Sequence, residues 1–198
     1  MSGLVIIGAG GHGKVVADTA ESCGYSNISF VDRNWPDRLK NGRWPVVGSN
    51  ASLDNGMQFC AIGNNATRAK VFTDQNLEKS PILIHESAVI SPTVKLGAGT
   101  VVVAGAVVNA DTHVGRGVIL NTGCSVDHDC SLGDFVHISP GARLAGNVTV
   151  GDCSWVGIGA VVIEGVSIGR NVIIAAGAAV INDVKDGEIV GGVPAKNL

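Results

Sequence analysis

A six-residue repeat runs without insertion through the C-terminal part of the chain. Every sixth residue from 84 to 180 is aliphatic, and the residue two places before it is mostly small. With roughly a third of residues aliphatic in an ordinary protein, a run of 17 matches does not arise by chance. The repeated positions are Ile84, Ile90, Leu96, Val102, Val108, Val114, Leu120, Val126, Leu132, Ile138, Leu144, Val150, Val156, Val162, Ile168, Ile174 and Val180.

A longer period is superimposed on the hexads. An aliphatic–glycine pair recurs every 18 residues, at Leu96-Gly97, Val114-Gly115, Leu132-Gly133, Val150-Gly151 and Ile168-Gly169. Three hexads therefore form one coil, in which each hexad is a short flat strand and a turn. Such coils stack into a triangular prism, a parallel β-helix, with the aliphatic side chains inside. Each buried aliphatic side chain contributes about 1.5–3 kcal/mol of gross hydrophobic stabilisation.

Residues 1–80 follow a different pattern, typical of a small α/β unit. About three parallel strands are expected, and Ser80-Pro81 marks a boundary between a domain at 1–80 and a second at 81–198. The expected elements are strands at 4–7, 28–32 and 59–62, helices at 12–23 and 66–78, and a polar loop at 34–56.

The first expected strand leads into the stretch GAGGHGKVV, residues 8–16. Gly8, Gly10 and Gly13 fit the spacing G-x-G-x-x-G, and Asp32 closes the second strand, where a dinucleotide-binding domain keeps its ribose-binding acid. A full dinucleotide domain needs two such halves, however, and only one is present. The turn is therefore predicted to bind one nucleotide diphosphate through backbone N–H groups rather than NAD.

Composition excludes several classes of function. The formal charge is −3 and the few Lys and Arg residues form no run, so a nucleic-acid partner is not expected. No apolar stretch reaches the roughly 18 residues needed to span a bilayer. Gly8 to Gly13 interrupt the first apolar run, so no signal peptide is expected. Five cysteines without such a signal indicate reduced thiols and a cytoplasmic protein.

The segment Val126-Asp127-His128-Asp129-Cys130 holds the strongest candidate for chemistry. Val126 is an inward anchor, so His128 falls near a prism corner, where a side chain can face a groove. A carboxylate bound to one imidazole nitrogen fixes the tautomer and raises basicity, which leaves the other nitrogen to accept a proton. Both Asp129 and Asp127 are candidates for that carboxylate. By position alone, His137 is expected to be exposed to solvent.

A zinc site is not expected. His113, His128 and His137 are separated by 15 and 9 residues, and none lie 18 apart, the spacing that would stack them on one face. Cys124 and Cys130 occupy the small inward position and are interpreted as core residues.

Motifs along the whole chain resemble one family. They are GHGKV (11–15), FVD (30–32), AIGNN (61–65), GVILNTG (117–123), VDHDC (126–130), AGNVTVG (145–151) and GVPAK (192–196). The repeat resembles the left-handed β-helix of the hexapeptide acyltransferases, an exception to right-handed crossovers. The chain as a whole is similar to nucleotide-sugar acetyltransferases of the sialic acid O-acetyltransferase type, and most similar to the bacillosamine-pathway UDP-4-amino-sugar N-acetyltransferases.

The resemblance implies a Rossmann-like half domain followed by a left-handed β-helix. It also implies acetyl-CoA-dependent N-acetylation of the C4 amine of a nucleotide-linked 4-amino-4,6-dideoxy sugar, for surface glycan or glycoprotein biosynthesis. Acetyl-CoA is then a co-substrate, no cofactor is permanently bound, and sites lie between the subunits of a homotrimer. The nucleotide could be UDP, GDP or dTDP.

The same resemblance implies roles for particular residues. His128 is the general base, and the next residue raises its basicity; that residue is usually Glu and here is Asp129. Nucleotide-sugar contacts fall at Gly10, Gly11, His12, Asp32, Arg33 and Gly63. Acetyl-CoA contacts fall at His137, Gly146, Ile158 and Ala176.

Three other functions remain as alternatives. The first is O-acetylation of a sugar or sialic acid. The second is a non-catalytic module that binds nucleotide-sugars. The third is a metal-dependent hydratase of the same β-helix class.

Overall fold

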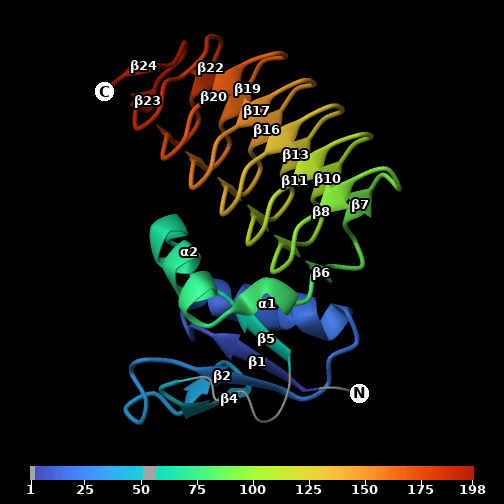
Figure 1. The fold of residues 1–198 in the computed structure, drawn as a ribbon, viewed down its shortest axis with the longest axis vertical. Coiled ribbons are helices and arrows are strands. Elements are labelled where there is room, and N and C mark those ends of the chain that lie inside the picture. Colours follow the sequence, from blue (N-terminus) through green and yellow to red (C-terminus); the bar gives the residue numbers. More distant parts are fainter. Residues whose placement is uncertain (1–2, 51–56) are drawn as a thin grey trace.

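The computed structural model describes residues 3–50 and 57–198, which form an α/β part and a prism (Figure 1). In the α/β part, both helices lie between a five-stranded sheet and the prism. Its elements are β1 (Leu4–Ile7), α1 (Gly11–Ser22), β2 (Ile28–Val31), β3 (Lys40–Asn41), β4 (Trp44–Gly48), β5 (Met57–Cys60), α2 (Asn65–Asp74) and the 3-10 helix η2 (Leu77–Lys79).

The sheet has the order β3-β4-β2-β1-β5. Strand β1 lies between β2 and β5 and is parallel to both, with Leu4 opposite Ile28 on one side and Met57 on the other. Strand β4 is parallel to β2, and β3 is antiparallel to β4. The carboxyl ends of β1, β2 and β5 meet at the cavity described below.

The expectation of three strands and a loop at 34–56 was wrong, because β3 and β4 lie inside that segment; its last residues, 51–56, are outside the described chain. Pro45 and the single buried residue Val46 give β4 little strand character of its own. Pairing with β2 holds β4 in place. The second helix also ends earlier than expected, at Asp74, and is followed by η2.

The prism contains 17 two-residue strands at the predicted spacing of six residues, which confirms the left-handed parallel β-helix. They are β6 (Leu83–Ile84), β7 (Val89–Ile90), β8 (Lys95–Leu96), β9 (Val101–Val102), β10 (Val107–Val108), β11 (His113–Val114), β12 (Ile119–Leu120), β13 (Ser125–Val126), β14 (Ser131–Leu132), β15 (His137–Ile138), β16 (Arg143–Leu144), β17 (Thr149–Val150), β18 (Trp155–Val156), β19 (Val161–Val162), β20 (Ser167–Ile168), β21 (Ile173–Ile174) and β22 (Ala179–Val180).

Every third strand belongs to the same face. The first face runs from β6 to β21, the second from β7 to β22 and the third from β8 to β20. Two more strands, β23 (Ile189–Gly191) and β24 (Lys196–Asn197), extend the first face, the last of them antiparallel. Residues 18 apart are paired, such as Leu120 with Ile138.

The aliphatic anchors form the core of the prism. From Val102 to Val180 all of them are buried, as are the small residues predicted beside them, including Cys124 and Cys130. The first coil is different, because no coil lies beneath it. Ile84, expected inside, is 39% exposed, while its neighbour Leu83 is buried against the α/β part.

Glycine recurs at one corner because the coils touch there. A Cβ added at Gly97 would stand 2.5 Å from the carbonyl carbon of Gly115, and one added at Gly115 would stand 2.6 Å from that of Gly133. No side chain fits between consecutive coils at this corner. The 18-residue period is therefore a packing requirement.

The α/β part packs against the first face and the adjoining corner. Helix α1 contacts β6 and β9, and Ala17 and Ala20 share a core cluster with Leu83, Val101 and Ile119. Within residues 3–50 and 57–198, no helix is long and apolar enough to cross a membrane.

Candidate functional site

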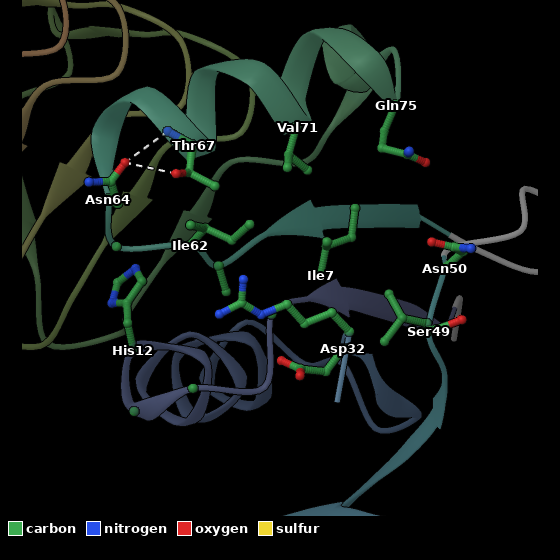
Figure 2. Close-up of a pocket in the computed structure, with 17 residues that line it drawn as sticks. Ile7, His12, Asp32, Ser49, Asn50, Ile62, Asn64, Thr67, Val71 and Gln75 are labelled. Atoms are coloured by element: carbon green, nitrogen blue, oxygen red, sulfur yellow. Dashed lines mark hydrogen bonds between the residues drawn. The ribbon is translucent and has the colours of Figure 1, made fainter. Parts of the chain in front are cut away.

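A cavity of about 650 Å³ lies at the carboxyl ends of β1, β2 and β5. Figure 2 shows α1 along one side of it and α2 along the other, with His12 rising from the start of α1 toward Asn64 at the start of α2. All the residues predicted to hold a nucleotide-sugar line this cavity: Gly10, Gly11, His12, Asp32, Arg33 and Gly63.

The glycine turn leaves the start of α1 open to an anion. Gly10 is the N-cap and supplies no side-chain hydrogen bond, and the first turn holds no acidic residue. A Cβ at Gly10 or Gly11 would meet nothing within 4 Å, whereas one at Gly13 would overlap the carbonyl oxygen of Gly8. Gly13 therefore permits close packing of strand and helix. The unpaired amides and the helix dipole at Gly11 favour a phosphate group.

Asp32 stabilises the glycine turn. Its carboxylate accepts hydrogen bonds from the amides of Ala9 (2.7 Å) and Asn34 (2.9 Å). Partial burial raises the pKa of Asp32, but these two hydrogen bonds outweigh it and leave the pKa below its usual value. The carboxylate is thus ionised at neutral pH, and Asp32 lines the cavity.

Two half-buried histidines meet where the α/β part touches the prism. The ring of His12 lies 6.4 Å from that of His137, which stacks on Trp155 at 5.9 Å. Burial, with the charge of Arg68 as a second cause, lowers the pKa of His12 to about 4 and that of His137 to about 3. Both rings are therefore neutral at physiological pH.

The expectation that His137 is exposed was wrong, because docking of the α/β part half-buries its ring. Its Nε2 lies 3.1 Å from the amide nitrogen of Asn121, which can only donate, so Nε2 is the acceptor. The Nε2 atom of His12 is buried and has no partner among the described residues.

His128 and Asp129 form an ion-pair-type contact at the edge between the second and third faces. The Nδ1 atom of His128 lies 2.8 Å from Oδ2 of Asp129. Asp129 has a left-handed backbone, with φ at 57°, as do Asp111 and Asn147 at the same corner of the neighbouring coils. The hydrogen bond that Asp129 accepts from His128 is the main cause that raises the pKa of His128 above its ordinary value.

Asp127 has different partners. Its Oδ1 accepts hydrogen bonds from the backbone amide of His128 (2.9 Å) and from the side-chain amide of Asn109 (2.8 Å). Of the two candidate carboxylates, Asp129 therefore contacts the imidazole ring of His128, and Asp127 contacts its backbone amide.

The His128 ring lies against Gly146, which occupies the same place one coil later. A Cβ at Gly146 would stand 2.5 Å from Cε1 and 2.6 Å from Nε2 of His128. The ring is 55% exposed, and no described residue bonds Nε2. This atom is free to accept a proton from a ligand.

The four predicted acetyl-CoA residues do not meet within one chain. Gly146 lies beside His128, and His137 lies on the first face. Ile158 and Ala176 are exposed at equivalent places in successive coils, on the edge between the first and second faces. The edge that carries His128 is also opposite the first face, where the cavity-bearing α/β part is docked.

Arg68, Asn121, Trp155 and Asn109 were not singled out from the sequence. A single Arg in a helix and a Trp at an outward strand position carry no signal of their own. Docking of the two parts brings Arg68 to the prism. The other three residues contact Asp127 or His137 within the prism itself. Among the described residues, no group of three or more His, Cys, Asp or Glu side chains is arranged to hold a metal ion.

A left-handed β-helix with an exposed His–carboxylate pair, joined to a nucleotide-sized cavity, defines a hexapeptide-repeat acetyltransferase. Residues 3–74 match the model of the PglD N-terminal domain. Together with the similarities that follow, this match shows that the chain belongs to the PglD-like nucleotide-sugar N-acetyltransferases.

Two solved structures are similar over nearly the whole chain. The acetyltransferase domain of PglB from Neisseria gonorrhoeae FA1090, in complex with acetyl coenzyme A, is 41% identical, with 98% of each chain covered and a TM-score of 0.93. A histidine-to-alanine variant of GDP-perosamine N-acetyltransferase from Caulobacter crescentus, in complex with CoA and GDP-perosamine, is 42% identical, with 100% of this chain and 97% of that chain covered and a TM-score of 0.94.

A curated relative matches over a shorter segment. UDP-N-acetylbacillosamine N-acetyltransferase of Bacillus subtilis (strain 168) is 34% identical over 113 residues. The matched segment spans about half of each protein, 52% of this chain and 52% of the relative.

Proposed function

We propose that this protein transfers the acetyl group of acetyl-CoA to the C4 amine of a UDP-linked 4-amino-4,6-dideoxy sugar. The observation that carries the proposal is the His128 ring, with Nδ1 on Asp129 and Nε2 free above Gly146. The cavity around the glycine turn supports a nucleotide diphosphate as the handle of the acceptor. The complex of the Caulobacter enzyme with CoA and GDP-perosamine supports the same two classes of substrate, a CoA thioester and a nucleotide-linked sugar.

In the proposed reaction, the sugar amine attacks the thioester carbonyl carbon, and Nε2 of His128 takes the proton that the nitrogen releases. The C–N bond forms first, which gives a tetrahedral oxyanion that backbone N–H groups stabilise. The C–S bond then breaks, and the imidazolium returns the proton to the thiolate of coenzyme A. Asp129 keeps the ring in the tautomer with hydrogen on Nδ1, so that Nε2 is the basic atom.

We further propose that the working unit is a homotrimer with the site between two chains. The cavity lies on the side of the first face, and His128 lies on the opposite edge, so a sugar held in the cavity does not reach His128 of the same chain. A neighbouring prism supplies it, because a cyclic assembly has heterologous interfaces that bring different surfaces together. Acetyl-CoA would lie between the prisms, near His137, Ile158 and Ala176 of one chain and Gly146 of the next. We place this reaction in the cytoplasm, where both substrates are made.

The proposal is tested by acetyl-CoA turnover on a panel of acceptors. Thiol release and mass spectrometry are followed with a UDP-4-amino-4,6-dideoxy sugar, GDP-perosamine and free sialic acid, with His128→Ala as the control. We expect an N-acetylated UDP-sugar. Turnover on sialic acid alone would favour the O-acetyltransferase, and tight calorimetric binding of NAD without any nucleotide-sugar would contradict the assignment of the cavity.

A further inference from the structure

Arg68 in α2 is 1% exposed and lies where the α/β part meets the prism. Its guanidinium donates only to neutral oxygens. Nε donates to the carbonyl of Gly117 (2.7 Å), Nη1 to those of Ile62 (3.0 Å) and Gly63 (3.1 Å), and Nη2 to the carbonyl of Phe135 (2.7 Å) and to Oδ1 of Asn65 (2.9 Å).

Within the described residues, no carboxylate forms an ion pair with this cation. Arg116, at the same junction, is half-exposed and pairs with Glu78 and Asp134. Burial lowers the pKa of Arg68 to about 10, which leaves it charged at neutral pH. Burying an unpaired cation is costly, and an apolar side chain would fill the same space without that cost. Packing alone therefore does not account for Arg68.

The acceptors of Arg68 lie on two functional surfaces. Ile62 and Gly63 form part of the cavity wall, in the loop that leads to α2. Phe135 lies two residues before His137, the first residue of β15, and Gly117 belongs to the coil below. Asn65 reinforces this link, because its side-chain nitrogen donates to the carbonyls of Cys153 (3.0 Å) and Ser154 (3.1 Å) in the coil above.

We propose that Arg68 is a positioning residue that fixes the cavity loop at 61–65 to the prism strand of His137, so that the bound nucleotide diphosphate keeps one position relative to the acetyl-transfer groups. This inference rests on the proposed function. The planar fork of Arg68 reaches carbonyls on both surfaces at once, and its buried charge lies directly behind the cavity wall, where it attracts the diphosphate. A lysine carries the charge but lacks the fork, so it cannot tie the two surfaces together.

The test compares Arg68→Gln and Arg68→Lys with the matched pair Arg116→Gln and Arg116→Lys, which alter another arginine of the same junction. Hydrogen exchange of peptides that cover 61–65 and 135–138 measures order in the two surfaces without any ligand. Calorimetry with UDP, GDP and CoA measures binding, and kcat and KM are measured with the acceptor that the wild type uses. Circular dichroism and Tm establish which variants are folded.

We expect exchange in both peptides to accelerate about tenfold or more in the Arg68 variants, with Lys no better than Gln, because neither side chain has the fork. Nucleoside diphosphate affinity should fall about tenfold in Arg68→Gln and be only partly restored in Arg68→Lys. CoA affinity should change less than about threefold, so the loss appears in KM for the nucleotide-sugar. The Arg116 variants should change neither exchange nor affinity by more than about twofold.

Unchanged exchange and affinity in a folded Arg68 variant would overturn the proposal, as would full rescue by Lys. If Arg68→Gln does not fold, the exchange and affinity of Arg68→Lys decide whether the proposal stands. If the wild type binds no nucleoside diphosphate, the proposed function fails, and the exchange data still decide whether Arg68 positions the loop.

Discussion

The imidazole of His128 lies so close to Gly146 that a methyl group on Gly146 would stand 2.5 Å from Cε1 of the ring. The two residues are separated by one coil, 18 residues in the sequence. Gly146 therefore sets the height at which the candidate base stands above the prism, while Asp129 sets its rotation.

Replacing Gly146 by Ala is expected to displace the ring and leave the fold intact. The backbone of Gly146 is not left-handed, and the atoms in the way belong to an exposed side chain that can turn aside. We expect kcat/KM to fall about 10- to 100-fold, because a misplaced base loses its proton-transfer geometry. In a His128→Ala background the same change should cost no further activity. A comparable loss there would mean that the methyl group acts on something other than His128.

The pH dependence of activity should report the contact between His128 and Asp129. The hydrogen bond that Asp129 accepts from Nδ1 raises the pKa of His128. Only the neutral ring can act as a base, so kcat/KM should rise as pH increases through that raised pKa. In Asp129→Asn the rising limb should move to lower pH, with a smaller loss of maximal rate than the roughly 100-fold or greater loss expected for His128→Ala. Asp127→Asn, which lacks the ring contact, should move the limb less. An unshifted profile in Asp129→Asn would contradict this assignment.

His12 and His137 should remain neutral while His128 titrates. Their pKa values, about 4 and about 3, lie below the ordinary 6.5, so their ring signals in NMR should stay constant from pH 8 to pH 5. Below pH 6.5 the unfolded chain takes up protons that the folded chain does not, and stability therefore falls as pH decreases. Each histidine contributes at most about 1.4 kcal/mol per pH unit to this loss. Urea unfolding at pH 7 and pH 5 measures this loss of stability in the wild type and in His12→Gln. If the free energy of unfolding falls equally with pH in both proteins, His12 is not a source of the loss.

Mixed trimers should recover activity if the site is shared between chains. Gly11→Trp disables the glycine turn but keeps His128, and His128→Ala keeps the turn. Refolding equal amounts together should restore complete sites at about one interface in four when mixing is random. Mixed trimers verified by mass spectrometry that show no activity would refute the shared site, though not the chemistry.

The prism was predictable from the sequence because its period depends on neighbouring coils alone. The anchors from Val102 to Val180 are buried as expected. Ile84 is exposed instead, because it lies in the first coil and has no coil beneath it to cover its side chain. The six residues predicted to contact the nucleotide-sugar do line one cavity, because the carboxyl ends of parallel strands share one edge of a sheet. Strand β4 was missed, since its pairing with β2 overrides a local sequence that contains Pro45.

Contacts between the two parts of the chain could not be predicted from either part alone. His137 is half-buried, and Arg68 is fully buried, only because the α/β part docks on the first face. Neither residue belongs to a periodic pattern that marks this surface. The choice between Asp129 and Asp127 likewise required the side-chain geometry, in which Asp129 contacts the ring and Asp127 contacts the backbone amide of His128.

The stacked corner glycines set the unit in which such a prism can change its length. Because Gly115 and Gly133 must lie directly over one another, an insertion or deletion preserves the stack only when it comprises whole coils of 18 residues. A change of six residues would bring side chains to the corner where the coils touch. Whole coils added beyond Ile168 would leave His128 and Gly146 in place. The height of the scaffold and the chemistry it carries can therefore be altered separately, by evolution or by design.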